Sequence, residues 1–137
     1  ATDPRPQGKD LVIANAFAKA NEMAVAVRLG LMALGDLSKP LVVIANSPEG
    51  QVIHYLLGRF GRNYGGRQHP VATLPEEMDI IIQAPYLDRT FGDWFYNPEV
   101  ITWTRNWQQT LQLLQDRCGR SARAAVLPNA TMQYFDS

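Results

Sequence analysis

Five short runs of apolar residues are spaced along the chain, and each has the composition of a β-strand. Three are continuous aliphatic stretches, Asp10–Ala14, Leu41–Ala45 and Asp79–Ala84, and two are weaker, Glu99–Trp103 and Ala124–Leu127. Aliphatic runs without polar alternation are typical of strands that are covered on both faces, as in parallel sheets. The pattern therefore predicts a mostly parallel sheet of four or five strands.

Helical periodicity occupies the segments between these runs. Apolar residues at Met23, Val27, Leu31 and Leu34 share one face of a helix that Gly35 is placed to end. This pattern predicts a helix from about residue 21 to residue 34, between the first two strands.

Two further helices are predicted. Ser47 can cap a helix and Pro48 suits its first turn, so a second helix is expected to run from there to Phe60. The last helix is expected before Gly119, on a stripe of apolar residues formed by Trp107, Leu111, Leu114 and Cys118.

Strands that alternate with helices predict right-handed crossovers and therefore a parallel sheet between two helical layers. The expected fold class is α/β, a three-layer sandwich in which helices flank the sheet. Residues 1–9 contain two prolines and are interpreted as a linker, whereas residues 10–137 are interpreted as one domain that is a piece of a larger protein.

Composition narrows the class of function. The 137 residues contain 13 Lys plus Arg and 13 Asp plus Glu, and a zero net charge argues against a general nucleic-acid binder. The single cysteine, Cys118, excludes an internal disulfide and suggests a reducing compartment, so a cytoplasmic location is expected. No apolar run approaches the roughly 20 residues that span a bilayer. Two histidines are too few for a three-histidine metal site, so no metal ligand is assigned.

Polar residues follow the first two strands, where a parallel sheet places its ligands. Asn15 and Asn46 each come directly after an alanine that ends a strand, and Lys19, Glu22 and Glu49 lie within the next few residues. Their side chains could line a cleft for a substrate or cofactor. Equally, the two asparagines could serve only to shape their turns and cap the following helices.

A basic, glycine-rich segment forms a second candidate site. Gly58–Arg67 contains arginines at Arg59 and Arg67 among glycines and aromatic residues, and arginine forks suit carboxylates or phosphates. The segment supports an alternative function, a non-catalytic module that binds an anion, a nucleotide or RNA. A solvated helix end followed by a loop explains the same residues without a ligand.

An aromatic cluster between Phe91 and Trp107 supports a third possibility. Aromatic residues this close in sequence are more often core than cofactor site, and an exposed part of the cluster would suit docking to another domain.

Three segments of the chain resemble a known family. Asp10–Glu22, Ala45–Tyr55 and Ala125–Asn129 are similar to the carboxyl-terminal domain of nickel-dependent lactate racemase relatives. The resemblance implies a two-domain racemase or epimerase for 2-hydroxy acids, an isomerase whose active site lies in the cleft between the domains. This chain would close the cleft and would be inactive alone. Its partners would be the amino-terminal catalytic domain of the same parent chain and a small 2-hydroxy acid.

The resemblance also implies a cofactor, a nickel-pincer nucleotide that is held mainly by the amino-terminal domain. That domain supplies the family's tether lysine and its nickel-binding and acid–base histidines, so no catalytic residue is assigned here. Where the family's lactate enzymes carry glutamine and lysine on the first helix, this chain has Val25 and Arg28. Because valine cannot form a hydrogen bond through its side chain, the substrate is expected to differ from lactate.

Overall fold

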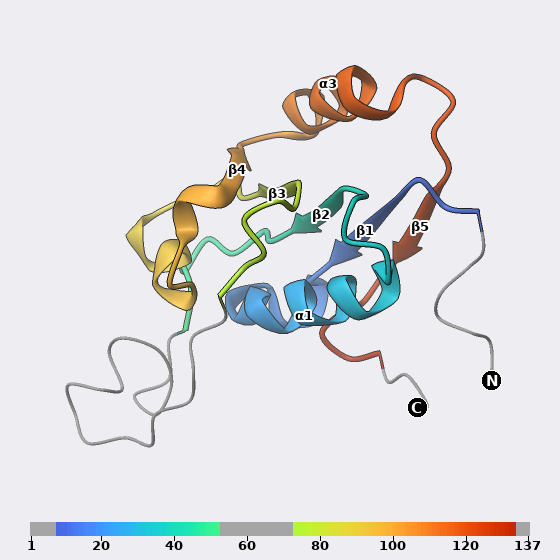
Figure 1. The fold of residues 1–137 in the computed structure, drawn as a ribbon. Coiled ribbons are helices and arrows are strands. Elements are labelled where there is room, and N and C mark those ends of the chain that lie inside the picture. Colours follow the sequence, from blue (N-terminus) through green and yellow to red (C-terminus); the bar gives the residue numbers. More distant parts are fainter. Residues whose placement is uncertain (1–7, 53–72, 134–137) are drawn as a thin grey trace.

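All five predicted strands are present in the computed structural model, which describes residues 8–52 and 73–133 (Figure 1). They form one sheet in the order β4-β3-β2-β1-β5, and every neighbouring pair is parallel. The strands are β1 Leu11–Asn15, β2 Leu41–Ile44, β3 Ile80–Gln83, β4 Ile101–Thr104 and β5 Ala124–Leu127.

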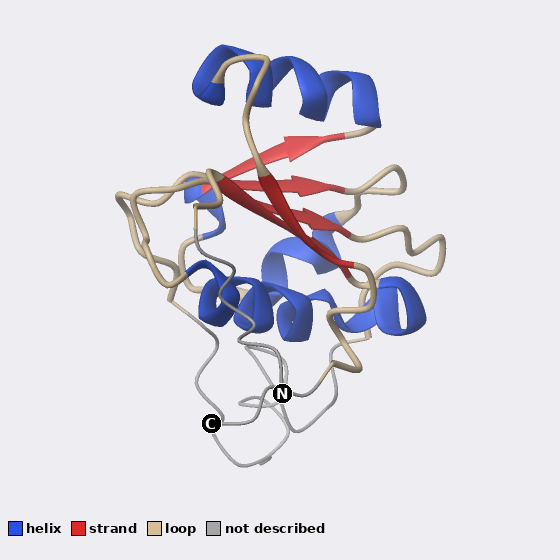
Figure 2. Ribbon diagram, turned by 90° about the vertical axis from the view of Figure 1, so that its right-hand side faces the viewer, coloured by secondary structure: helices blue, strands red, loops and turns tan. Residues whose placement is uncertain are grey.

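The order of the strands fixes the layers. From β1 to β4 the chain steps across the sheet in one direction, and from β4 to β5 it returns to the far side of β1. Right-handed crossovers in opposite directions place their helices on opposite faces. Helix α1, Met23–Leu34, accordingly lies on one face, and α3, Trp107–Cys118, lies on the other (Figure 2). The fold is the predicted three-layer α/β sandwich.

The main hydrophobic core lies between the sheet and α1. Alternate residues of the central strands, such as Val12, Val43 and Ile82, point into it and are fully buried. Three short 3-10 helices complete this layer: η1 Phe17–Glu22, η2 Arg89–Trp94 and η3 Pro98–Val100. Most of the aromatic cluster belongs here, because Phe91 and Phe95 are fully buried and Trp94 is nearly so.

The packing of α3 differs from the predicted stripe. Leu114 and Cys118 face the sheet as expected, but Trp107 and Leu111 are 39% and 40% exposed. The fully buried residue of the first turns is Thr110, whose hydroxyl lies 2.7 Å from that of Thr104. The first turns of α3 therefore face the sheet through a polar contact at Thr110 and not through the apolar stripe that periodicity predicts.

The helix predicted to begin at Ser47 does not begin there. The Ser47 hydroxyl donates to the carbonyl of Gly50 at 2.5 Å and does not cap a helix, and Gly50 has a positive φ of 75°. Residues 47–50 form a turn, and the remainder of the predicted helix, from residue 53 on, lies outside the described residues. No helix in residues 8–52 and 73–133 has the length and apolar character to cross a bilayer.

Candidate functional site

A polar hollow of about 220 Å³ lies at the carboxyl ends of β1 and β2. Its walls come from η1 and from the turn after β2, and the residues that give it chemistry are Phe17, Asn21, Asn46, Ser47 and Glu49. The hollow is where the topology of parallel sheets places ligands. It presents amide groups and one carboxylate, a set suited to hydrogen bonding with hydroxyl groups.

The turn that carries Asn46 and Glu49 is held in a fixed shape. Gly50 donates its N–H to the Ser47 carbonyl at 3.1 Å while its own carbonyl accepts from the Ser47 hydroxyl. Gly50 is required here for two reasons: its φ of 75° is left-handed, and a Cβ atom would lie 2.7 Å from Oδ2 of Asp88. The backbone below the hollow is therefore specified by sequence.

Gln51 ties this turn to the rest of the site. Its side-chain oxygen accepts from the Met23 N–H at 3.0 Å and from the Trp94 indole N–H at 3.1 Å, and its side-chain nitrogen donates to the Ala20 carbonyl at 2.8 Å. Its backbone N–H donates to the Thr90 hydroxyl at 2.9 Å. One buried glutamine thus joins η1, the start of α1 and η2.

Two of the five predicted cleft residues line the hollow, namely Asn46 and Glu49. Asn15 lies nearby but shapes a turn, because its side-chain oxygen accepts from the Phe17 N–H at 3.1 Å. Its backbone carbonyl accepts from the Ala130 N–H at 2.8 Å, which holds the segment after β5 beside the end of β1. This hydrogen bond supports the interpretation that Asn15 shapes the turn after β1.

Lys19 and Glu22 lie on η1 and do not line the hollow. The Lys19 Nζ atom lies 3.9 Å from Oε2 of Glu22, so the two charges offset one another. Lys19 also marks a break in η1, with φ −133° and ψ 53°. Since both side chains are partly exposed, the ion pair contributes little to stability and leaves both groups accessible.

The predicted anion contacts, Arg59 and Arg67, lie outside the described residues, as does the whole Gly58–Arg67 segment. The structure therefore places no arginine of that segment relative to the hollow.

Three residues at this edge of the sheet were not predicted. Phe17 lines the hollow and is 72% exposed. Asn21 contributes an amide to the wall. The side-chain oxygen of Asn129, just after β5, is buried and accepts no hydrogen bond from the part of the chain that the structure describes. The sequence offered one indication that these three residues belong to the site, namely that they follow the ends of strands β1 and β5.

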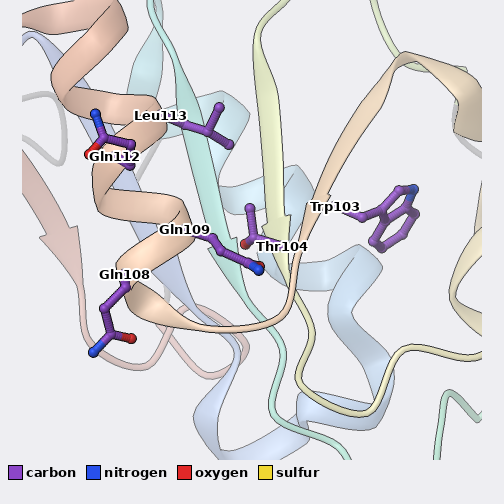
Figure 3. Close-up of a pocket in the computed structure, with 6 residues that line it drawn as sticks. All are labelled: Trp103, Thr104, Gln108, Gln109, Gln112 and Leu113. Carbon is purple, nitrogen blue, oxygen red and sulfur yellow. The ribbon is translucent and has the colours of Figure 1, made fainter.

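Two other features bear on chemistry elsewhere. A hollow of about 580 Å³ lies between α3 and the outer edge of β4, where α3 presents three glutamines and Leu113 (Figure 3). Cys118 has a raised pKa, first because partial burial desolvates the thiolate and then because Asp79 and Asp10 are near, so the thiol is not an activated nucleophile. Within residues 8–52 and 73–133, no three His, Cys, Asp or Glu side chains are grouped to hold a metal.

The fold and the hollow define the class of protein: a parallel α/β domain with a hydrogen-bonding hollow at the carboxyl edge of its sheet. No family model, curated protein or solved structure matches the chain.

Proposed function

We propose that this chain is the cleft-closing domain of a two-domain racemase or epimerase for 2-hydroxy acids, of the kind represented by nickel-pincer lactate racemases. The observation that carries the proposal is the open polar hollow with Phe17 exposed at its rim. A hollow that is polar, open to solvent and bordered by an exposed aromatic ring has the character of half a binding site. Another surface would have to meet it to enclose a ligand.

The described residues do not form a site for the nickel of such a cofactor. They contain no group of three or more metal-binding side chains. As in the family that the chain resembles, the proposal assigns the nickel-pincer nucleotide and its ligands mainly to the other domain, and no step of the reaction is assigned here to the cofactor.

The residues of the hollow have a defined task in the proposal. The Glu49 carboxylate accepts a hydrogen bond from a hydroxyl group, and the amides of Asn21 and Asn46 donate to an oxygen or accept from a hydroxyl. Phe17 covers the ligand and excludes water when the domains close. Val25 and Arg28, which take the place of the glutamine and lysine of the lactate enzymes, are exposed on α1, and the proposal keeps the expectation of a substrate other than lactate.

The test uses the full-length parent protein, co-expressed with the enzymes that synthesise the nickel-pincer nucleotide. We expect about one nickel per chain, a nucleotide adduct on a lysine outside these 137 residues, and interconversion of the enantiomers of at least one acid in a 2-hydroxy acid panel. Absence of both nickel and adduct, in cells where a known nickel-pincer enzyme is loaded, would refute the proposal. It would direct attention to anion binding by Gly58–Arg67.

Variants of the hollow separate its role from that of the cofactor. Asn46→Ala and Glu49→Gln should leave the nickel content unchanged and lower kcat/KM by roughly 10- to 100-fold, the effect of a lost hydrogen bond of about 1.5–3 kcal/mol to a charged or buried group. Glu77→Gln is the matched control, because Glu77 is an exposed acid at the amino end of β3, away from the hollow. Equal activity of all three variants would exclude the hollow from the active site.

A further inference from the structure

Strand β4 forms one edge of the sheet, and one residue on its outer side offers both backbone groups to a partner. The Thr104 carbonyl accepts from the Ala84 N–H at 2.8 Å, so the peptide groups of Thr104 face β3. In a parallel pair, successive residues alternate in the side to which their N–H and C=O point. The N–H and C=O of Trp103 therefore point away from the sheet.

The neighbouring outward N–H groups are already occupied. The Ile101 N–H donates to the carbonyl of Pro98, and the Arg105 N–H donates to Oε1 of Gln109 at 2.8 Å. Edge strands are commonly blunted in this way, which prevents unspecific pairing. Among the outward residues of the described edge, Trp103 is thereby the one that offers both an N–H and a C=O to an added strand.

Two hollows meet at Trp103, one on each face of the sheet. The first, about 580 Å³, lies on the α3 side and is lined by Thr104, Gln108, Gln109, Gln112 and Leu113. The second, about 430 Å³, lies on the opposite side, where the indole of Trp103 packs edge-on to Phe91. It is lined by Leu87, Asp88, Arg89, Gly92, Pro98 and Arg105. Figure 3 shows the indole and the α3 glutamines on opposite sides of β4.

This arrangement matches the needs of an added strand. Side chains of an extended peptide point alternately to the two faces of a sheet, so consecutive residues of the peptide would enter the two hollows in turn. The backbone of the peptide would pair with the N–H and C=O of Trp103. We propose that the β4 edge binds an extended peptide segment by strand addition, with an acidic residue opposite Trp103.

The positive charge of the hollow beside the Trp103 indole favours an acidic residue at the peptide position opposite Trp103. The peptide residue opposite Trp103 points to the same face as the indole, into the hollow that holds Arg89 and Arg105. Neither arginine forms an ion pair with another described residue, and Oδ1 of the one acid there, Asp88, already accepts from the Thr90 N–H and hydroxyl. A carboxylate fits this surplus of positive charge. The flanking peptide residues enter the uncharged glutamine hollow, which suits small β-branched side chains.

The test uses the 137-residue chain and a fluorescein-labelled pentapeptide, Thr-Val-Glu-Val-Thr, followed by fluorescence anisotropy. With two backbone hydrogen bonds and one charge contact, a Kd of order 0.1 mM is expected. Two isomeric control peptides carry one N-methyl group, either on the central glutamate or on the valine after it. Depending on the direction of the added strand, one of these two N–H groups donates to the Trp103 carbonyl, so one isomer should bind at least tenfold more weakly.

Protein variants test the charge contact without disturbing the core. Arg89→Glu combined with Arg105→Glu should weaken binding at least tenfold and should favour the peptide whose glutamate is replaced by lysine. Arg120→Glu, an exposed change in the loop after α3, is the matched control and should bind as the unaltered chain does.

Hydrogen exchange at the Trp103 amide supplies a direct readout, and it should be fast in the free protein and slowed by the peptide. Three results would overturn the proposal: no binding at 1 mM peptide, equal binding of both N-methyl isomers and the parent peptide, or an unchanged Trp103 amide when the peptide is bound. Equal binding of the three peptides together with loss in the arginine variant would indicate charge attraction without strand addition.

Discussion

Gln51 offers the sharpest test of how the turn below the hollow is held. Substitution by methionine keeps the length and approximate volume of the side chain but removes both hydrogen-bonding functions. The Met23 N–H and the Trp94 indole N–H lose their acceptor, and the Ala20 carbonyl loses its donor. Gln51 is 7% exposed, so water replaces these bonds poorly.

The expected cost follows from these three groups. A buried donor or acceptor left without a partner costs about 1–3 kcal/mol, and the apolar methionine offsets part of that through its own burial. We therefore expect Gln51→Met to lower the free energy of unfolding by about 3 kcal/mol. With a urea slope of about 1–3 kcal/mol/M, the unfolding midpoint should fall by roughly 1–3 M.

A double-mutant cycle assigns part of this cost to one bond. Trp94→Phe removes the indole N–H while keeping an aromatic ring, and it should cost about 1 kcal/mol less in the Gln51→Met background than in the unaltered chain. Far-UV circular dichroism during urea unfolding measures all four proteins. A loss below 1 kcal/mol for Gln51→Met, or strictly additive effects in the cycle, would refute the argument that Gln51 organises this region.

Three further predictions concern separate parts of the molecule. Gly50→Ala should destabilise the fold by about 1–3 kcal/mol more than Gly119→Ala in urea unfolding, because both glycines have positive φ but only Gly50 is crowded by a neighbouring side chain. Cys118 should react with iodoacetamide more slowly in the folded chain than in urea at pH 8, as followed by mass spectrometry, because burial raises the pKa of its thiol; an equal rate would contradict this. Hydrogen bonds from the Ser38 hydroxyl and N–H lower the pKa of Asp36, so the ionised Asp36 carboxylate should stabilise the fold above the unfolded carboxyl pKa, and this stabilisation should disappear as the pH falls through the lower folded pKa. Ser38→Ala should shift the NMR titration of Asp36 to higher pH, and an unmoved titration would refute the assignment.

Strand and helix positions were predictable where burial alone decides them. The aliphatic runs of β1, β2 and β3 are buried on both faces, so their composition carries the signal directly. The burial of Met23 and Val27 on α1 follows equally from periodicity. In these segments the burial of apolar side chains dominates, and the pattern of apolar residues in the sequence predicts it.

The incorrect predictions fall where polar contacts compete with burial. Nothing in the spacing of apolar residues indicates that the Thr110 hydroxyl meets Thr104 below α3 and leaves Trp107 exposed. Ser47 has the composition of a helix cap, but its hydroxyl bonds Gly50 across a turn instead. Serine and threonine hydroxyls have several possible partners, and only the tertiary structure selects among them.

The candidate site was predictable in location but not in membership. Topology placed it after β1 and β2, and Asn46 and Glu49 do line the hollow. Asn15 was equally eligible by sequence, yet its side-chain oxygen is taken by the Phe17 N–H. Which of several neighbouring polar side chains faces a ligand depends on backbone geometry over two or three residues, and a sequence pattern does not resolve that.

The pairing of β1 with β5 has a consequence for synthesis of the protein. Leu11 pairs with Ala124, so β1 leaves the ribosome more than a hundred residues before β5, its neighbour on one side in the sheet. Until then, a strand as apolar as β1 has an open edge to which a strand of another nascent chain could add. Such distant pairing also closes slowly. Refolding yield should therefore fall with rising protein concentration, and chaperone dependence should be greatest before residue 124 is available.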